Sequence, residues 1–279
     1  MTKLYKDANK SPIFHIAIVF LLAVGFVALP VSKLFILFGI NGTISRLISG
    51  AALRLILSIA AVFFIVKYGF SKIFKNKITA ISILLTLPAV LVALNNAPII
   101  GLISGNVYFS SDGVGIFLFV LYCVFVGIYE ELIFRGIIFP LVLIKTKNCK
   151  HGAFIAILIS SLLFAAAHLL NLLSGAGILD TLLQMGYSFL IGGMCAISLC
   201  VTKNIFVAIF LHAVYDIGGL MTDAGIGICK GNSWDTATIV ITAILGVIVF
   251  AFEIILVLKL NVKDVCESFG IDNAEPEIF

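Results

Sequence analysis

Eight long apolar runs, separated by short polar loops, constrain the fold of this chain more than any other feature. They lie near residues 12–30, 46–68, 78–95, 114–140, 152–170, 180–201, 204–220 and 236–259. A helix that crosses a bilayer needs about 20 predominantly apolar residues, and each run is close to that length. The sequence therefore predicts an all-α, polytopic membrane helix bundle with about eight transmembrane helices, in which residues 1–279 form a single integral membrane domain.

The composition supports this class and excludes others. Hydrophobic residues make up 62% of the chain and charged residues 11%, whereas soluble domains contain roughly 45–50% and 25%. The net charge of +4 comes from basic residues spaced singly between apolar blocks, so we expect a lipid bilayer as partner and no nucleic acid. The six cysteines show no CxxC or CxxH spacing, which favours small buried hydrophobes over a metal or disulfide framework.

Lysine and arginine residues are distributed unequally between alternate loops. With the N-terminus inside, thirteen fall on the cytoplasmic side and three, Lys33, Arg46 and Lys230, on the other. Cytoplasmic loops of membrane proteins carry the excess of these residues, so both termini are predicted to be cytoplasmic. Arg54 falls inside the second run, and we expect its side chain to snorkel or to pair internally. Short loops favour a multi-pass protein of a prokaryotic plasma membrane.

Three of the apolar runs contain ionisable residues, which are costly at bilayer depth and commonly functional. Glu130, Glu131 and Arg135 lie in the fourth run, and Pro140 is expected to kink its helix or end it early. His168 lies in the fifth run, and His212 with Asp216 lies in the seventh. Three helices can thus contribute polar groups to one buried pocket.

The spacing of these residues suggests how they interact. Glu131 and Arg135 are i,i+4 neighbours and can form an ion pair along one helix face, while Glu130 points about 100° away and lacks such a partner. His212 and Asp216 are also i,i+4 neighbours. The set suits either a hydrolytic water or a divalent cation. The alternative is structural, with one buried ion pair and histidines that form hydrogen bonds between helices.

Three short motifs resemble those of a known family. EELIFR (130–135), FAAAH (164–168) and HAVYD (212–216) look like the EExxxR, FxxxH and HxxxN/D motifs of the CPBP membrane proteins. That family includes the type II CAAX prenyl endopeptidases and bacteriocin-processing or self-immunity relatives. The motifs occur in the family's order on separate predicted helices, and the motif-bearing core covers about residues 110–220.

The resemblance implies an intramembrane endopeptidase that cleaves a membrane-associated, CAAX-like or leader-bearing peptide or protein. Glu130 would activate a water that His168 helps to hold, and His212 and residue 216 would polarise the carbonyl. Asp216 stands where an asparagine would donate to an oxyanion, so it must be protonated, orient His212 or bind metal. Zn²⁺ or another divalent ion held by Glu130, His168, His212 and Asp216 is one implied arrangement, and a water activated without metal is the other.

Two other functions remain open from the sequence. A non-catalytic scaffold of the same family would serve bacteriocin immunity or regulate signalling with the same motifs. A proton-coupled transporter also places glutamate, arginine and histidine inside the membrane, although it usually shows repeated halves, which this sequence lacks. The residues do not identify the substrate.

Overall fold

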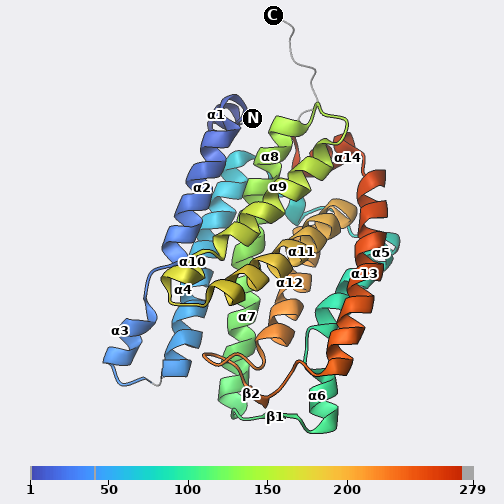
Figure 1. The fold of residues 1–279 in the computed structure, drawn as a ribbon. Coiled ribbons are helices and arrows are strands. Elements are labelled where there is room, and N and C mark those ends of the chain that lie inside the picture. Colours follow the sequence, from blue (N-terminus) through green and yellow to red (C-terminus); the bar gives the residue numbers. More distant parts are fainter. Residues whose placement is uncertain (1, 41, 272–279) are drawn as a thin grey trace, which may run out of the picture.

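The computed structural model describes residues 2–40 and 42–271 and is built almost entirely of helices (Figure 1). Its elements, in chain order, are α1 (Lys3–Lys10), α2 (Pro12–Val27), α3 (Ser32–Leu37), α4 (Gly42–Tyr68), η1 (Ser71–Phe74), α5 (Ala80–Asn95), α6 (Ile99–Ser104), β1 (Val107–Phe109), α7 (Gly113–Ile133), η2 (Phe134–Ile138), α8 (Phe139–Thr146), α9 (Gly152–Ala167), α10 (Leu170–Leu173), α11 (Ile178–Thr202), α12 (Ile205–Leu220), β2 (Cys229–Gly231), α13 (Thr236–Lys259) and α14 (Val262–Phe269). The predicted all-α, polytopic membrane bundle is confirmed.

Each predicted span contains a helix, but not all are equally long. Six helical segments within the described residues are long and apolar enough to cross a membrane: 12–37, 42–68, 113–146, 152–173, 178–202 and 236–259. The other two predicted spans correspond to α5 and α12, which are apolar but have 16 residues each. At about 1.5 Å per residue, these two are shorter than the hydrocarbon core is thick, about 30 Å.

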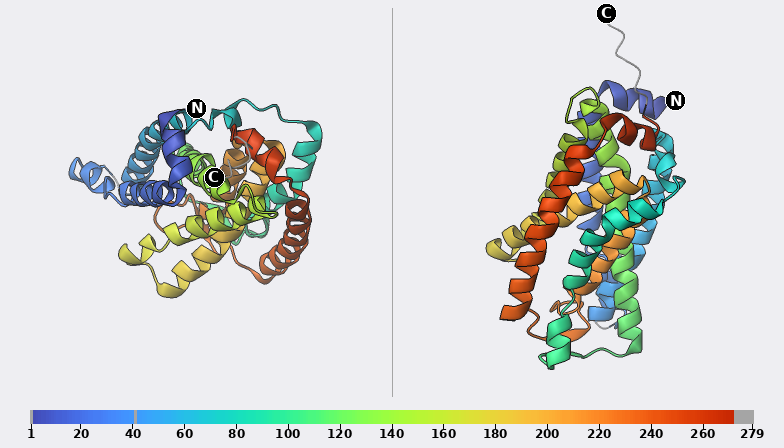
Figure 2. Two further views of the ribbon diagram at one scale, coloured as in Figure 1. Left: turned by 90° about the horizontal axis from the view of Figure 1, so that it is seen from above. Right: turned by 90° about the vertical axis from the view of Figure 1, so that its right-hand side faces the viewer.

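The chain from α7 to α8 runs through the bundle, with α2 and α4 on one side and α11 and α12 on the other (Figure 1). Seen along the bundle axis, α13 lies at the periphery (Figure 2, left). Every residue from Phe139 to Ile144 is buried, so α8 is enclosed by neighbouring helices rather than lipid. The functional motifs therefore lie on elements that packing holds from several sides.

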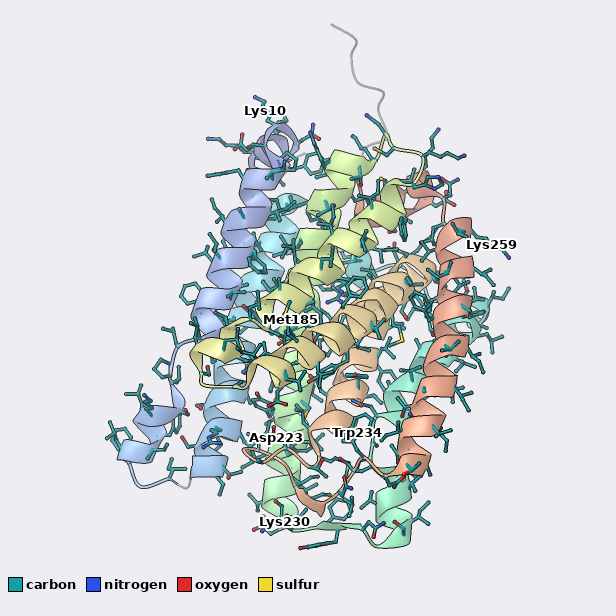
Figure 3. All side chains as sticks on the ribbon, in the orientation of Figure 1. Lys10, Met185, Asp223, Lys230, Trp234 and Lys259 are labelled. Atoms are coloured by element: carbon teal, nitrogen blue, oxygen red, sulfur yellow. The ribbon has the colours of Figure 1, made fainter. Side chains whose placement is uncertain are left out.

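Short elements that the sequence did not predict cover both ends of the bundle. At one end the Thr2 hydroxyl donates to the Lys67 carbonyl, and the Lys72 ammonium donates to the carbonyl of Glu267 in α14 at 3.1 Å. At the other end β1 pairs antiparallel with β2, with Val107 opposite Gly231. Lys10 and Lys259 lie at the first end and Lys230 at the second (Figure 3).

We expect the end that carries Lys10 and Lys259 to face the cytoplasm, because that end collects most of the lysines. A reporter fused after Phe279, which lies outside the described residues, should report a cytoplasmic position. A reporter inserted in the loop 96–113 should report the opposite side. Alkaline phosphatase and fluorescent protein fusions at the two sites measure this, and exchanged readings would reverse the orientation.

Candidate active site

The first motif lies where a long helix changes its hydrogen-bonding pattern. α7 passes into the π-helical turn η2, and the amide of Phe139 donates to the carbonyl of Phe134, five residues back. Pro140 has no amide hydrogen and its ring crowds the preceding turn, so a wider turn lets the helix pass through the proline. The chain was expected to kink or end near Pro140, but it stays helical to Thr146.

Glu131 and Arg135 form a fully buried ion pair, as their i,i+4 spacing predicted. Arg135 Nη1 lies 2.9 Å from Glu131 Oε1, and both side chains are 0% exposed. Arg135 Nη2 also donates to the carbonyl of Gly192 in α11 at 2.6 Å. The guanidinium carbon lies 4.8 Å from the centroid of the Phe164 ring. One arginine thus joins α7, α9 and α11.

Gly192 is needed for this junction because the arginine and the Phe164 ring approach its backbone closely. A Cβ atom at Gly192 would lie 2.9 Å from Arg135 Nη2 and 3.0 Å from the Phe164 ring. Gly192 was not among the residues predicted from the sequence. The Gly192-Gly193 pair within an apolar helix was the available signal, since small residues mark close helix contacts in membranes.

His212 binds the same carboxylate as Arg135. Its Nδ1 lies 2.7 Å from Glu131 Oε1, an oxygen that also lies 2.9 Å from Arg135 Nη1, and in this hydrogen bond Nδ1–H donates to the carboxylate. The hydrogen bond fixes the orientation of the ring and turns Nε2 toward Glu130 and Asp216. Nε2 lies 3.6 Å from Glu130 Oε2 and 3.5 Å from Asp216 Oδ2. The contact between Glu131 and His212 was not foreseen from the sequence.

A close approach of α7 and α12 makes these contacts possible. A Cβ atom at Gly127 would lie 3.0 Å from the amide nitrogen of Ala213, so the two backbones touch one turn below Glu130. Gly127 precedes Glu130 by three residues and Ala213 follows His212 directly. The two small residues therefore set the distance between the carboxylates of α7 and the imidazole of α12.

His168 shares an aromatic neighbour with His212. The Phe164 ring contacts both imidazoles edge to face, with centroid separations of 5.3 Å to His168 and 5.5 Å to His212. His168 Nδ1 lies 3.1 Å from the Phe164 carbonyl, to which it donates. Its Nε2 is then an acceptor and faces the Ser188 hydroxyl at 3.4 Å. Phe164 is the first residue of the FAAAH motif, and the sequence did not reveal its role.

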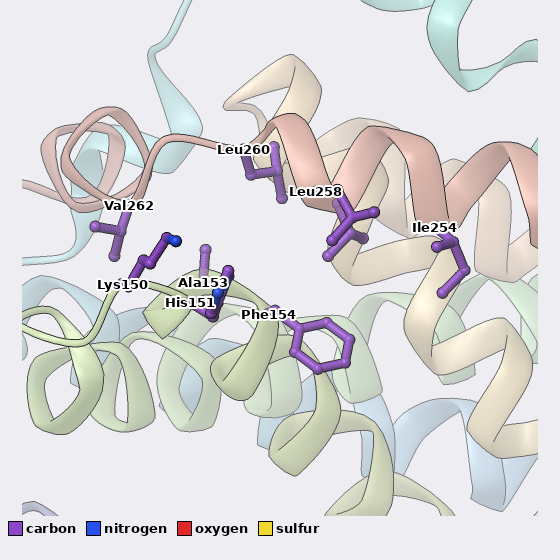
Figure 4. A pocket seen from close by; sticks show the side chains of 9 residues that line it. Lys150, His151, Ala153, Phe154, Ile254, Leu258, Leu260 and Val262 are labelled. Carbon is purple, nitrogen blue, oxygen red and sulfur yellow. The ribbon is translucent and has the colours of Figure 1, made fainter.

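The four residues predicted to be catalytic line one cavity of about 1140 Å³: Glu130, His168, His212 and Asp216. Glu131 and Arg135 are not among its lining residues. A second cavity of about 440 Å³ lies beside Lys150 and His151 (Figure 4) and shares Phe154, Ile254 and Val257 with the first. The two adjacent glutamates thus lie in different surroundings, one on the cavity and one behind it.

The predicted metal ligands are not arranged as a metal site. Within the described residues, no three of Glu130, His168, His212 and Asp216 offer ligand atoms within 4.8 Å of one another. A buried group that does so is Glu131, Cys195 and His212, although the cysteines were predicted to be simple hydrophobes.

This group fits a cation poorly. Glu131 Oε1 already holds the Arg135 guanidinium and the His212 Nδ1–H, so a divalent ion would meet a positive charge at about the distance of its own ligands. The Cys195 thiol lies 3.7 Å from the Ala208 carbonyl. A Glu/Cys/His cluster is present, but its chemistry is that of an ion pair and hydrogen bonds.

Part of this chain matches a known protein family. Residues 112–218 match the family described as type II CAAX prenyl endopeptidase Rce1-like. Over this region the chain is similar to that family. The Rce1-like region begins at the N-cap of α7 and ends within α12, so it includes all six residues singled out from the motifs. No curated protein and no solved structure matches the chain. Arg54 and the helices α2, α4, α5 and α13 lie outside the Rce1-like region.

Proposed function

We propose that this protein is an intramembrane endopeptidase that hydrolyses a peptide bond in a membrane-associated substrate, with Glu130 as the general base. The observation that carries the proposal is the difference in exposure and pairing between the two adjacent glutamates. The Glu130 side chain is 19% exposed on the cavity, whereas that of Glu131 is 0% exposed and paired with Arg135. Of these two glutamates, Glu130 is therefore the one that can take a proton from a water molecule in the cavity.

His168 would hold that water. Its Nδ1–H is used by the Phe164 carbonyl, which leaves the Nε2 lone pair to accept a hydrogen bond. The Ser188 hydroxyl at 3.4 Å is its neighbour there, and a water can occupy the same acceptor. Glu130 would remove one proton as the water oxygen bonds to the scissile carbonyl carbon. The same carboxylic acid would then give its proton to the departing amine nitrogen.

His212 would stabilise the oxyanion formed on the carbonyl oxygen. Glu131 accepts from Nδ1–H, and with a hydrogen on Nε2 as well the imidazolium can donate to the oxyanion. Asp216 lies 3.5 Å from the same Nε2 and would orient it. Glu131 and Arg135 act through His212 and are positioning residues in this scheme.

The matching family is described as CAAX prenyl endopeptidase, so a fluorescence-quenched, prenylated CAAX peptide is the first probe. Purified protein in lipid vesicles should cleave it between two residues identified by mass spectrometry. A scaffold or a transporter with the same motifs would bind or move a ligand without breaking the peptide.

Asp216→Asn separates two roles for the carboxylate. If Asp216 orients His212 through a hydrogen bond, an asparagine amide can replace it and cleavage should fall by less than about tenfold. If its negative charge is required to keep His212 protonated, the variant should lose about 10²-fold or more, with the pH–rate profile moved to lower pH. The initial rates of peptide cleavage between pH 5 and 9 measure this. We expect the first result, and Asp216→Ala, which can do neither, should be the less active variant.

A further inference from the structure

Arg54 is a cation on the cavity wall that has no carboxylate partner. It lies in the middle of α4 and lines the same cavity as Glu130 and Asp216. No acidic oxygen among residues 2–40 and 42–271 approaches its guanidinium within 4.0 Å. Its Nη1 donates weakly to the Gly50 carbonyl at 3.4 Å, and its buried Nε has no hydrogen-bond partner. An internal partner was one of the two expectations for Arg54, and no carboxylate among these residues fills that role.

The surroundings of Arg54 contrast with those of Arg135. Arg135 is paired with Glu131, whereas the Arg54 guanidinium lies over the Tyr122 ring, whose centroid is 5.2 Å away. An arginine stays protonated in proteins and offers a planar fork that matches a carboxylate. A charge in a membrane helix is costly. A guanidinium that faces a cavity and has unused hydrogen-bond donors is suited to bind an anion there.

The position of Arg54 along the bundle defines which part of a substrate could reach it. α4 and α7 lie side by side and run in the same direction, because a Cβ atom at Gly50 would touch Tyr122 and one at Gly136 would touch Ile65. This register puts Arg54 beside Val126, one helical turn or about 6 Å from Glu130 along the axis. The guanidinium reaches further toward Tyr122, away from the end that carries Lys145.

The direction and distance fit the end of a peptide. An extended chain advances about 3.3 Å per residue. If the scissile carbonyl of a peptide lies at Glu130, groups two or three residues further along the peptide therefore lie about 7–10 Å from that carbonyl. An α-carboxylate at that place can accept two parallel hydrogen bonds from the guanidinium. Asp216 lines the same cavity, but its carboxylate already pairs with His212 Nε2 at 3.5 Å.

We propose that Arg54 binds the free C-terminal carboxylate of the substrate. The inference rests on the proposed endopeptidase function and assigns a specificity-determining residue to it, outside the Rce1-like region. The competing explanation is that Arg54 only offsets the charges of Glu130 and Asp216. A role of that kind would act on every substrate alike.

The test compares two prenylated CAAX peptides that differ only in a free C-terminal acid or a C-terminal amide. Wild-type protein should prefer the acid in kcat/KM. Arg54→Gln should reduce kcat/KM for the acid by about 10–100-fold, the usual cost of a lost charged hydrogen bond. The loss should appear mainly in KM. The value of kcat/KM for the amide should change little. Arg54→Lys, which keeps the charge but not the fork, should fall between. Arg46→Gln, an exposed arginine two turns away on α4, is the control.

Each other result overturns the proposal. Equal losses on acid and amide in Arg54→Gln would make Arg54 a counter-charge for the active-site acids. Equal cleavage of acid and amide by wild-type protein would leave the endopeptidase function intact and remove the carboxylate subsite. If wild-type protein cleaves neither peptide, the proposed function fails and the subsite fails with it. Gel filtration of each variant, together with the Lys variant, separates misfolding from lost recognition.

Discussion

Replacing Glu130 by glutamine should lower the rate of peptide cleavage by about 10²–10⁴-fold, the usual contribution of a general base. Glutamine keeps the size of the side chain but cannot accept a proton from water. The change should appear in kcat, because the peptide still contacts the rest of the cavity. Initial rates with the prenylated CAAX peptide in vesicles, together with peptide binding by the inactive variant, measure both quantities.

The matched control is Glu267→Gln, in which the same chemical change is made at an exposed position of α14. Glu267 interacts with the rest of the molecule through its backbone carbonyl, which accepts from Lys72, so the variant should keep wild-type activity. The Glu130 variant should also keep wild-type thermal stability, because its carboxylate forms no short ion pair. Full cleavage by well-folded Glu130→Gln would remove the general base from the mechanism and favour a binding scaffold.

Much of the bundle could be predicted because bilayer spans leave a strong signal in composition. The eight apolar runs all became helices, and the Glu131–Arg135 pair followed from helical spacing alone. The surface elements α1 and α14 were missed because each has eight residues with polar groups and resembles a loop in a search for long apolar runs. The pairing of β1 with β2 was missed because three-residue strands carry no periodicity.

The site itself depends on contacts that spacing within one helix does not reveal. His212 meets Glu131 across 81 positions of sequence, and that contact depends on how closely α7 and α12 approach at Gly127 and Ala213. The motifs predicted that Glu130 and His212 belong together but not that Glu131 would hold His212. Arg54 was expected to snorkel or to pair internally, and the apolar run around it gave no sign that it lines the cavity.

Arg135→Met should destabilise the folded protein by about 3–5 kcal/mol, the typical cost of leaving one member of a buried ion pair without its partner. Methionine fills much of the arginine's volume, but it leaves Glu131 buried beside the empty position and removes the bond to the Gly192 carbonyl. The yield of monodisperse protein and the midpoint of thermal unfolding in detergent should both fall. Arg46→Met, at an exposed position of α4, should leave both unchanged.

The double variant Glu131→Leu with Arg135→Met distinguishes charge from packing. Because it removes both charges, most of the lost stability should return, as buried ion pairs are often replaced by apolar residues without net cost. Cleavage should stay low, because His212 Nδ1 would lose its acceptor and Nε2 would no longer be held toward Glu130. A single Arg135→Met variant as stable as wild type would mean that Glu131 is neutral when buried. A double variant with full activity would show that His212 needs no positioning by Glu131.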